Sequence, residues 1–245
     1  MTAWIPKLSE GSAYAKVRLR GTVWERIDLA QTVYRWLTQA GGALGRSGIS
    51  PNAITWLSLL FAAASGVAVM TGAFGAGAVL LIVSGLCDAL DGAVARATGR
   101  VSPFGALLDS TIDRVADALP LVGLMVFLTG QPGLALVPVL AMLGSFVVPY
   151  VRARAESLGV TLPPLFMRRP ERLVLLVLSL LLGALPIAGL LPKVLTLVGV
   201  GLMALLSFWG AVSALRAARD ALEPGSRDRE PPPSVRSRPV TASGP

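Results

Sequence analysis

The sequence contains no histidine and a single cysteine, and only 15% of its 245 residues are charged. Without histidine the chain lacks the commonest general base and every nucleophile pair that depends on imidazole. The lone Cys87 cannot form an intramolecular disulfide, and it cannot complete an ordinary zinc site. We interpret Cys87 as a small, buried apolar residue. Any acid–base chemistry in this chain must therefore fall to carboxylates.

Apolar residues make up 53% of the chain and the mean hydropathy is +0.67, values typical of membrane proteins. Six segments are long enough to cross, or nearly cross, about 30 Å of hydrocarbon. They cover residues 52–70, 75–97, 105–128, 133–157, 171–190 and 194–215. The sequence thus predicts an all-α integral membrane protein with six transmembrane helices in a domain spanning residues 50–218.

The two ends of the chain differ from this apolar domain. Residues 1–49 read as a cytoplasmic basic arm followed by an amphipathic helix over 24–40, which we expect to lie in the membrane interface. Gly41, Gly42, Gly45 and Gly48 are expected to end that helix. Ser50 and Pro51 have the residue types of a helix cap and first turn. Residues 219–245 are rich in Pro, Ser and charge, and the sequence predicts a disordered tail.

The basic residues are distributed unevenly around the predicted spans. Only Lys193 of the 22 Lys and Arg falls in the hairpin tips at 71–74, 129–132 and 191–193. The positive-inside rule therefore places both termini and the other two connections in the cytoplasm, with the protein in the plasma (inner) membrane as a multi-pass chain. We attribute the net charge of +8 to contact with anionic membrane lipids and not to nucleic-acid binding.

Four carboxylates interrupt the otherwise apolar second and third spans. Asp88 and Asp91 stand three residues apart, and Asp109 and Asp113 four apart, so each pair shares one helix face. If the two helices are antiparallel neighbours, all four carboxylates converge. Such a group near a bilayer is costly unless a cation binds between its members. Carboxylates alone suit a hard divalent ion, Mg²⁺ or Mn²⁺, of the kind that bridges phosphate oxygens.

These residues belong to a longer pattern, Asp-x2-Asp-Gly-x2-Ala-Arg-x8-Gly-x3-Asp-x3-Asp, that spans 88–113. At every fixed position and spacing this pattern resembles the signature of the CDP-alcohol phosphatidyltransferases. The resemblance implies transfer of a phosphatidyl group from CDP-diacylglycerol to an alcohol, with release of CMP, and it also implies a homodimer. Displacement of CMP from a diphosphate suits two metal ions that hold the nucleophile and the leaving group in line.

The resemblance also implies roles for individual residues. Asp88, Asp91 and Asp109 would hold metal, whereas Asp113 would contact the second ion and take the proton from the acceptor hydroxyl. The residues expected to contact the CDP moiety of the lipid are Ser50, Pro51, Asn52, Ala53, Gly92, Arg96, Ser102 and Gly105. The active site would then lie at the cytoplasmic ends of the second and third spans, where the acyl chains can remain in the leaflet.

Arginines gather after the fourth span, between positions 152 and 172. They can be read as snorkelling side chains that obey the positive-inside rule, or as an anion pocket beside the carboxylates. Within the family, the Tyr150 to Glu156 segment and the Arg-Pro-Glu-Arg-Leu run are similar to the phosphatidylinositol phosphate synthases. This similarity implies that Arg152, Arg154 and Arg172 bind the phosphate of a phosphorylated acceptor, inositol phosphate.

Other functions are compatible with parts of the pattern. Phosphatidylglycerophosphate synthase, or another member of the family, would share the reaction and differ in the acceptor. An intramembrane prenyltransferase would carry its Asp-rich motifs about a hundred residues apart, whereas 17 residues separate Asp91 from Asp109. A carboxylate-based transporter would continue its polar residues across the bilayer, but the outer halves of the spans are almost wholly apolar.

Overall fold

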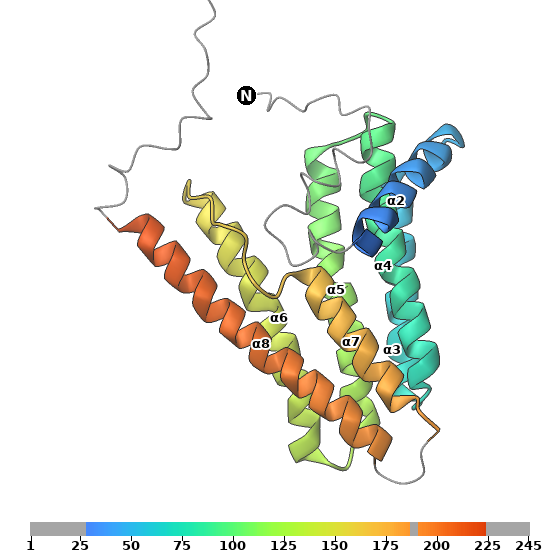
Figure 1. The fold of residues 1–245 in the computed structure, drawn as a ribbon, viewed down its shortest axis with the longest axis vertical. Helices are drawn as coiled ribbons and strands as arrows, with labels where there is room; N and C mark the ends of the chain where they lie inside the picture. Colours follow the sequence, from blue (N-terminus) through green and yellow to red (C-terminus); the bar gives the residue numbers. More distant parts are fainter. Residues whose placement is uncertain (1–27, 187–190, 224–245) are drawn as a thin grey trace, which may run out of the picture.

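The fold was obtained as a computed structural model, which describes residues 28–186 and 191–223. These residues form seven helices and no strand (Figure 1). The helices are α2 (Asp28–Arg46), α3 (Pro51–Met70), α4 (Phe74–Ala97), α5 (Pro103–Phe127), α6 (Pro132–Ser157), α7 (Arg169–Gly183) and α8 (Leu191–Leu222).

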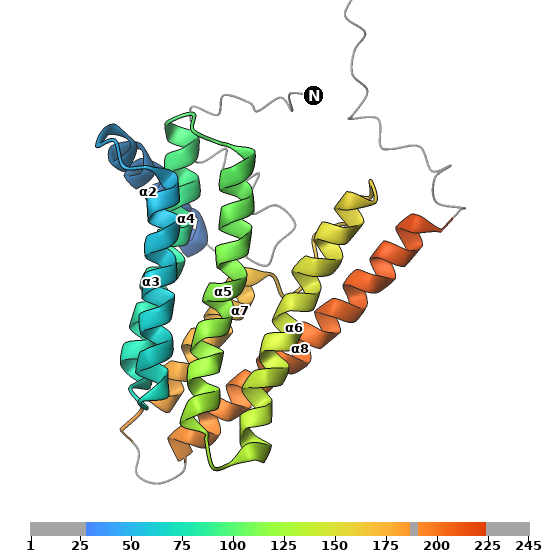
Figure 2. The ribbon, with the colours of Figure 1, turned by 180° about the vertical axis from the view of Figure 1, so that it is seen from behind.

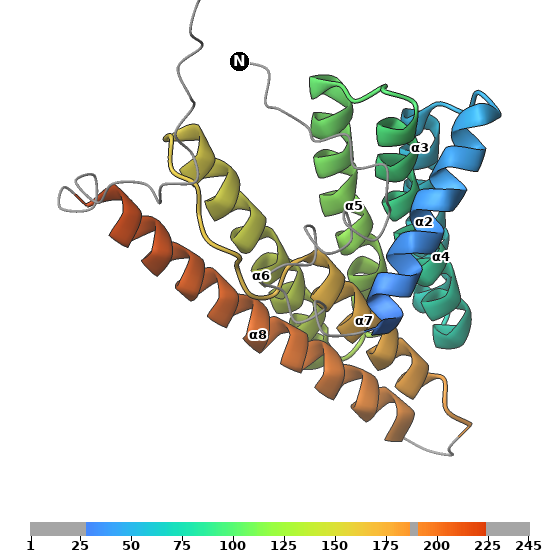
Figure 3. The ribbon, with the colours of Figure 1, turned by 45° about the horizontal axis from the view of Figure 1, so that its top comes forward.

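The long helices form two groups that meet at one end of the molecule. α3, α4 and α5 pack together on one side, α6 and α8 pair on the other, and α7 lies between α4 and α8 (Figures 1 and 2). The two groups diverge toward the end that carries the α4–α5 connection, as the tilted view also shows (Figure 3). The candidate site residues predicted from the sequence lie in this diverging half.

The hydrophobic core fills the half where the helices converge. Its fully buried members come from α3 to α8 and include Val69, Leu81, Leu121, Leu180 and Met203. Cys87 is also buried, in a smaller apolar cluster of α3 and α4, as the sequence predicts. The close-packed half therefore holds the helices together, and their diverging ends line the site.

Serine caps begin the two helices nearest that site. The Ser50 hydroxyl accepts a hydrogen bond from the Ala53 N–H at 3.1 Å, and the Ser102 hydroxyl accepts one from the Gly105 N–H at 3.0 Å. In both cases a proline follows the cap at the first helical position, where its missing N–H costs nothing. The predicted cap at Ser50 is confirmed.

Glycines let α3 and α5 approach until their backbones touch. A Cβ added at Gly66 would lie 2.7 Å from the carbonyl oxygen of Leu119, and one added at Gly123 would meet the backbone of Gly66. Small residues at such crossings allow close helix contact in membrane proteins. This crossing fixes the relative position of the helix that carries Asp109 and Asp113.

The predicted end of the N-terminal helix is wrong. α2 continues through Gly41, Gly42 and Gly45 to Arg46, and Gly48 with φ of +81° follows it. α2 packs directly on α4. A Cβ at Gly41 would lie 2.7 Å from that of Ala93, so the close contact requires a glycine within the helix. Gly41 and Gly45 lie at this helix crossing, whereas a Cβ at Gly42 would meet nothing within 4 Å. Of the four glycines only Gly48 has the backbone conformation of a terminator.

Four helices in the described residues are long and apolar enough to cross a membrane: α3, α4, α6 and the 193–222 part of α8. α5 matches its predicted span closely, but four charged residues between positions 109 and 117 lower its hydropathy. α7 has only 15 residues, about 22 Å of helix, and ends at Gly183, so its predicted extension to position 190 is wrong. Pro186 accounts for this end, because the residue before a proline disfavours helical backbone.

Candidate active site

Three of the four motif carboxylates lie together between α4 and α5. Asp88, Asp91 and Asp109 each offer an oxygen, and these oxygens all lie within 4.8 Å of one another. Asp91 is the most enclosed of the three, with 5% of its surface exposed. The antiparallel arrangement of α4 and α5 brings these three together, whereas the spacing in the sequence predicts convergence of all four carboxylates.

A hydroxyl on α3 holds the buried carboxylate. Thr55 donates a hydrogen bond from Oγ1 to Oδ2 of Asp91 at 2.6 Å, and its own exposed fraction is 3%. Our sequence reasoning missed Thr55. The signal was available, because Thr55 is a polar residue inside an apolar helix, one turn after the Ser50-Pro51 start. The contact ties the start of α3 to the carboxylate cluster.

Arg169, at the first position of α7, crosses to the carboxylates from the opposite side. Its guanidinium forms ion pairs with Asp88, with Asp113 at 2.9 Å and with Asp117 at 3.3 Å. Our sequence reasoning assigned Arg169 no role. Its spacing from Arg172 is informative in retrospect, because residues three apart on a helix share one face.

Asp117 lies one turn beyond Asp113 on α5 and pairs with two arginines of α7. Its Oδ2 accepts a hydrogen bond from Arg172 at 2.8 Å, and its Oδ1 accepts one from Arg169 at 3.3 Å. Arg172 is nearly fully buried and also donates to the carbonyl oxygen of Met167 at 2.8 Å. Arg114 donates instead to the carbonyl oxygen of Ser110 on its own helix.

The carboxylate cluster fits a hard divalent cation. Its donors are carboxylate oxygens, which Mg²⁺ and Mn²⁺ prefer, and they converge from two helices. Oδ1 of Asp88 is buried and has no hydrogen-bond partner in the described residues. A buried, unpaired carboxylate oxygen is costly, and a metal ligand bond would satisfy it. Asp113 lies beside this group, where it pairs with Arg169.

The residues expected to contact a CDP-lipid surround the cluster at the same end of α3, α4 and α5. A Cβ at Gly105 would lie 3.1 Å from the Ser102 hydroxyl and 3.5 Å from Oδ1 of Asn52. A Cβ at Gly92 would lie 2.9 Å from a guanidinium nitrogen of Arg96. Both glycines thus leave room for polar groups, and Gly92 lets Arg96 fold back along α4.

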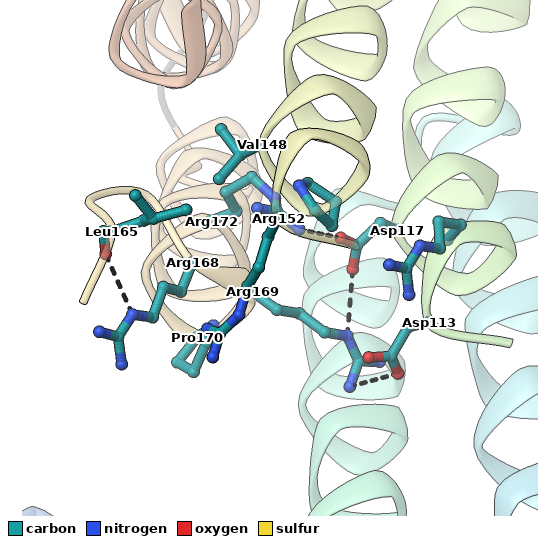
Figure 4. Close-up of a pocket in the computed structure, with 11 residues that line it drawn as sticks. Asp113, Asp117, Val148, Arg152, Leu165, Arg168, Arg169, Pro170 and Arg172 are labelled. Carbon is teal, nitrogen blue, oxygen red and sulfur yellow. Dashed lines mark hydrogen bonds and ion pairs between the residues drawn. The ribbon is translucent and has the colours of Figure 1, made fainter. Parts of the chain in front are cut away.

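A cavity of about 320 Å³ opens beside Asp113, between α5, α6 and the start of α7 (Figure 4). Five arginines and two aspartates line it, which gives its wall an excess of positive charge. They are Arg114, Arg152, Arg168, Arg169, Arg172, Asp113 and Asp117. The close-up shows that Arg169 and Arg172 reach toward Asp113 and Asp117, whereas Arg168 turns away toward the carbonyl of Leu165.

Two arginines of α6 are placed differently. Arg152 lines the cavity and pairs with Glu156 at 3.1 Å, and about half of each side chain is exposed. Arg154 is exposed and donates to Ser157 at 3.4 Å, and it is not among the residues that line the cavity. The structure therefore brings Arg152 and Arg172 to one cavity and leaves Arg154 outside it.

Comparison with known proteins places this site in a family. Residues 48–214 match the family described as CDP-alcohol phosphatidyltransferase. This chain belongs to the CDP-alcohol phosphatidyltransferases. The match covers α3 to α7 and most of α8, and includes all four motif carboxylates. The resemblance drawn from the sequence is confirmed, and the chain is an enzyme.

Relatives within the CDP-alcohol phosphatidyltransferases include an archaetidylinositol phosphate synthase of Pyrococcus horikoshii. It is 37% identical over 193 residues, which cover 77% of this chain and 94% of that protein. The phosphatidylinositol phosphate synthase of Mycobacterium tuberculosis is 31% identical over 199 residues, which cover 80% and 90% of the two chains.

Solved structures of the Mycobacterium tuberculosis enzyme share this fold. The crystal structure with CDP-DAG bound has a TM-score of 0.69 and 30% sequence identity, and the likeness covers 80% of this chain and 99% of that one. A second structure, in complex with manganese and citrate, has the same TM-score and covers 80% and 93%. The helical arrangement described above is thus the arrangement of an enzyme of this family.

Proposed function

We propose that this chain transfers a phosphatidyl group from CDP-diacylglycerol to a phosphorylated polar alcohol, inositol phosphate, and releases CMP. The observation that carries this proposal is the cavity of about 320 Å³ beside the carboxylate cluster. Five arginines against two aspartates suit an anionic acceptor, because guanidinium groups bind phosphate in paired, charge-assisted contacts. The names of the relatives support the same acceptor.

The donor would bind at the start of α3 and between α4 and α5. Asp88, Asp91 and Asp109 would hold the divalent cation, with Asp113 contacting a second ion, and Mg²⁺ or Mn²⁺ suits these oxygen donors. When bound, the cations neutralise the diphosphate oxygens and stabilise the charge on departing CMP. The manganese complex of the Mycobacterium tuberculosis enzyme supports a divalent cation. The place assigned to the CDP moiety would be lined by residues from three helix ends: 50–53, Gly92, Arg96, Ser102 and Gly105.

The acceptor would enter through the arginine-lined cavity. Its phosphate would bind Arg152 and Arg172, with Arg169 between the phosphate and the carboxylates. Asp113 takes the proton from the acceptor hydroxyl while the hydroxyl oxygen bonds to the phosphorus that carries the diacylglycerol. The bond from that phosphorus to the bridging oxygen breaks, and CMP leaves with the electron pair. Arg154 keeps a role only by the family resemblance.

The placement in the membrane follows from the helices and the charges. We propose six crossings, with α5 and α7 joining the four more apolar helices, and α2 lying at the interface. The end that carries the α4–α5 connection would face the cytoplasm of the plasma membrane, because the arginines concentrate there. The termini, which lie outside the described residues, would be on that same side. A homodimer is proposed from the resemblance alone.

An acceptor panel tests the proposed function. Purified protein with Mg²⁺ and CDP-diacylglycerol should release CMP with inositol 1-phosphate, and poorly with glycerol 3-phosphate, free inositol or serine. The neutral acceptors lack the charge that the arginines require, whereas glycerol 3-phosphate tests the shape of the alcohol. Preference for free inositol or serine would refute the phosphorylated acceptor, and preference for glycerol 3-phosphate would identify a phosphatidylglycerophosphate synthase.

A further inference from the structure

Asp117 is one of two carboxylates, with Asp113, in the wall of a cavity whose other charged residues are arginines. Its side chain is 14% exposed, and the family motif, which ends at Asp113, gives it no role. By charge alone, Asp117 opposes the binding of a phosphate at the neighbouring arginines. Because the charge of Asp117 weakens anion binding, its presence requires another explanation. The contacts of Asp117 provide one.

Asp117 joins α5 to both inward-facing arginines of α7. One oxygen accepts from Arg172 at 2.8 Å and the other accepts from Arg169 at 3.3 Å, so both oxygens are used (Figure 4). The exposed fractions of the two arginine side chains are 6% and 16%. Since long arginine side chains lose considerable rotamer entropy when ordered, a fixed partner that orders them in advance favours ligand binding.

The second hydrogen-bond partner of Arg172 is a backbone carbonyl in a constrained conformation. Its NH1 donates to the carbonyl of Met167, a buried residue with φ of +57°. This backbone conformation is uncommon for a residue other than glycine, so the packing around Met167 must hold it. The Arg172 guanidinium is therefore held by two hydrogen-bond partners, Asp117 on α5 and the Met167 carbonyl in the segment before α7.

We infer that Asp117 is a positioning residue for acceptor recognition: it fixes Arg172 in the orientation that binds the acceptor phosphate, whereas Arg169 has Asp88 and Asp113 as further partners. This inference rests on the proposed function, because it gives the cavity an anionic ligand. Charge and positioning predict opposite effects of removing the carboxylate. Loss of a negative charge alone would tighten acceptor binding, whereas loss of the arginine support would weaken it.

The isosteric variant Asp117→Asn separates these effects. We expect the KM for inositol 1-phosphate to rise at least tenfold, while the KM for CDP-diacylglycerol and the Mg²⁺ titration stay within twofold of the wild type. An unchanged or lower acceptor KM would overturn the inference. If Asp117→Asn fails to fold, Asp117→Glu serves instead: it keeps the charge but moves the carboxylate, and it should raise the acceptor KM at least threefold, with an unchanged value again overturning the inference.

Glu156→Gln is the matched control. Glu156 also pairs with an arginine of the cavity wall, Arg152, but half of each side chain is exposed to solvent. Exposed ion pairs position their partners weakly. This variant should keep the acceptor KM within twofold of the wild type. An effect as large as that of Asp117→Asn would mean that any loss of acidic charge disturbs the site, and would overturn the specific role of Asp117.

A double-mutant cycle shows whether Asp117 acts through Arg172. In the Arg172→Ala background, Asp117→Asn should raise the acceptor KM less than twofold, because Arg169 keeps Asp88 and Asp113 as partners. Independent effects, with the full tenfold rise in both backgrounds, would overturn the inference.

Inorganic phosphate, tested as an inhibitor of CMP release, separates failure of this inference from failure of the proposed function. If wild-type protein prefers a neutral alcohol, the proposed acceptor is wrong, and the inhibition constant for phosphate becomes the readout for Asp117. That constant should rise at least tenfold in Asp117→Asn and stay unchanged in Glu156→Gln. Absence of phosphate inhibition in the wild type, or an unchanged constant in Asp117→Asn, would overturn the inference.

Discussion

At the scale of single residues, Asp113 differs from the other motif carboxylates in its contacts. It lines the arginine-lined cavity, whereas Asp88, Asp91 and Asp109 converge on one another and are not among the residues that line it. Arg169 pairs with both Asp113 and Asp88 and so links the two places. Asp113 lies between the carboxylate cluster and the arginine-lined cavity. This position suits a residue that would receive a proton from the acceptor and lie beside the cations that hold the donor. We propose that the other three carboxylates bind the cation and do not transfer protons.

We therefore expect Asp113→Asn to abolish turnover while CDP-diacylglycerol still binds. The amide cannot accept the hydroxyl proton, but three carboxylates remain for the cation. A CMP-release assay measures turnover, and retention of the CDP-lipid by the purified variant measures binding. A loss of at least a hundredfold in turnover is expected from typical effects of removing a general base. Turnover close to that of the wild type would contradict the assigned role.

Thr55 gives a second test at this scale. Thr55→Val keeps the shape of the side chain but removes the hydrogen bond to Asp91, which would leave that carboxylate free to rotate. Loss of a group that orients a metal ligand typically weakens metal affinity by about 10- to 100-fold. Mn²⁺ binding measured by electron paramagnetic resonance should show this loss, and Thr55→Ser should restore most of the affinity. If Thr55→Val and Thr55→Ser bind Mn²⁺ with equal affinity, the Thr55 hydroxyl does not orient a metal ligand and its role is only structural.

Single residues also show what the sequence could and could not reveal. The carboxylates were predictable because each pair lies within one helical turn, so local spacing determines the shared face. Arg169 and Thr55 act across helices, on partners 52 and 36 residues away in the chain. Such contacts depend on how helices pack, which no local periodicity specifies. The family motif carries the first kind of information and not the second.

At the scale of helices, the predicted bounds of the first four spans lie within two residues of α3, α4, α5 and α6, and the two wrong helix ends have separate causes. Ser50-Pro51 and Ser102-Pro103 begin α3 and α5, because a side-chain cap and a proline act locally. The end of α2 was misjudged because glycines at a helix crossing, such as Gly41 against Ala93, look like terminators in the sequence. The end of α7 was misjudged because its apolar run continues past the position where Pro186 makes helical backbone unfavourable.

The α3–α5 crossing provides a stability test at this scale. Gly123→Ala would press a methyl group against the backbone of Gly66, which cannot move aside as a side chain can. Overpacking of this kind typically costs about 1–3 kcal/mol. Thermal unfolding in detergent should therefore occur at a lower temperature.

Gly201→Ala is the control for that experiment. The nearest atom to its added Cβ is Cγ1 of Val137 at 3.8 Å, an ordinary contact distance. Because alanine favours helix over glycine by about 0.8–1 kcal/mol, this variant should be as stable as the wild type or slightly more stable. Equal destabilisation by both substitutions would contradict the tight crossing.

At the scale of the whole molecule, the converging and diverging halves have different tasks. The helices converge at one end and diverge at the other (Figure 2). The converging half contains the main apolar core, and the diverging half contains the carboxylates, the arginine-lined cavity and the exposed end of α6. This division suits a reaction between a lipid and a water-soluble acceptor. In the proposed reaction the acyl chains would stay beside apolar helices, and the polar acceptor would enter from the aqueous side.

That division makes a prediction about orientation. Gln131 precedes α6 at the converging end, and Leu158 follows α6 at the diverging end, and both are exposed. Their substitution by cysteine is informative because the natural Cys87 is buried and should not react. If the diverging half faces the cytoplasm, a membrane-impermeant maleimide added to intact cells should label Gln131→Cys and spare Leu158→Cys. Leu158→Cys should become reactive once the cells are permeabilised, whereas the reverse pattern would place the active site outside and contradict the positive-inside argument.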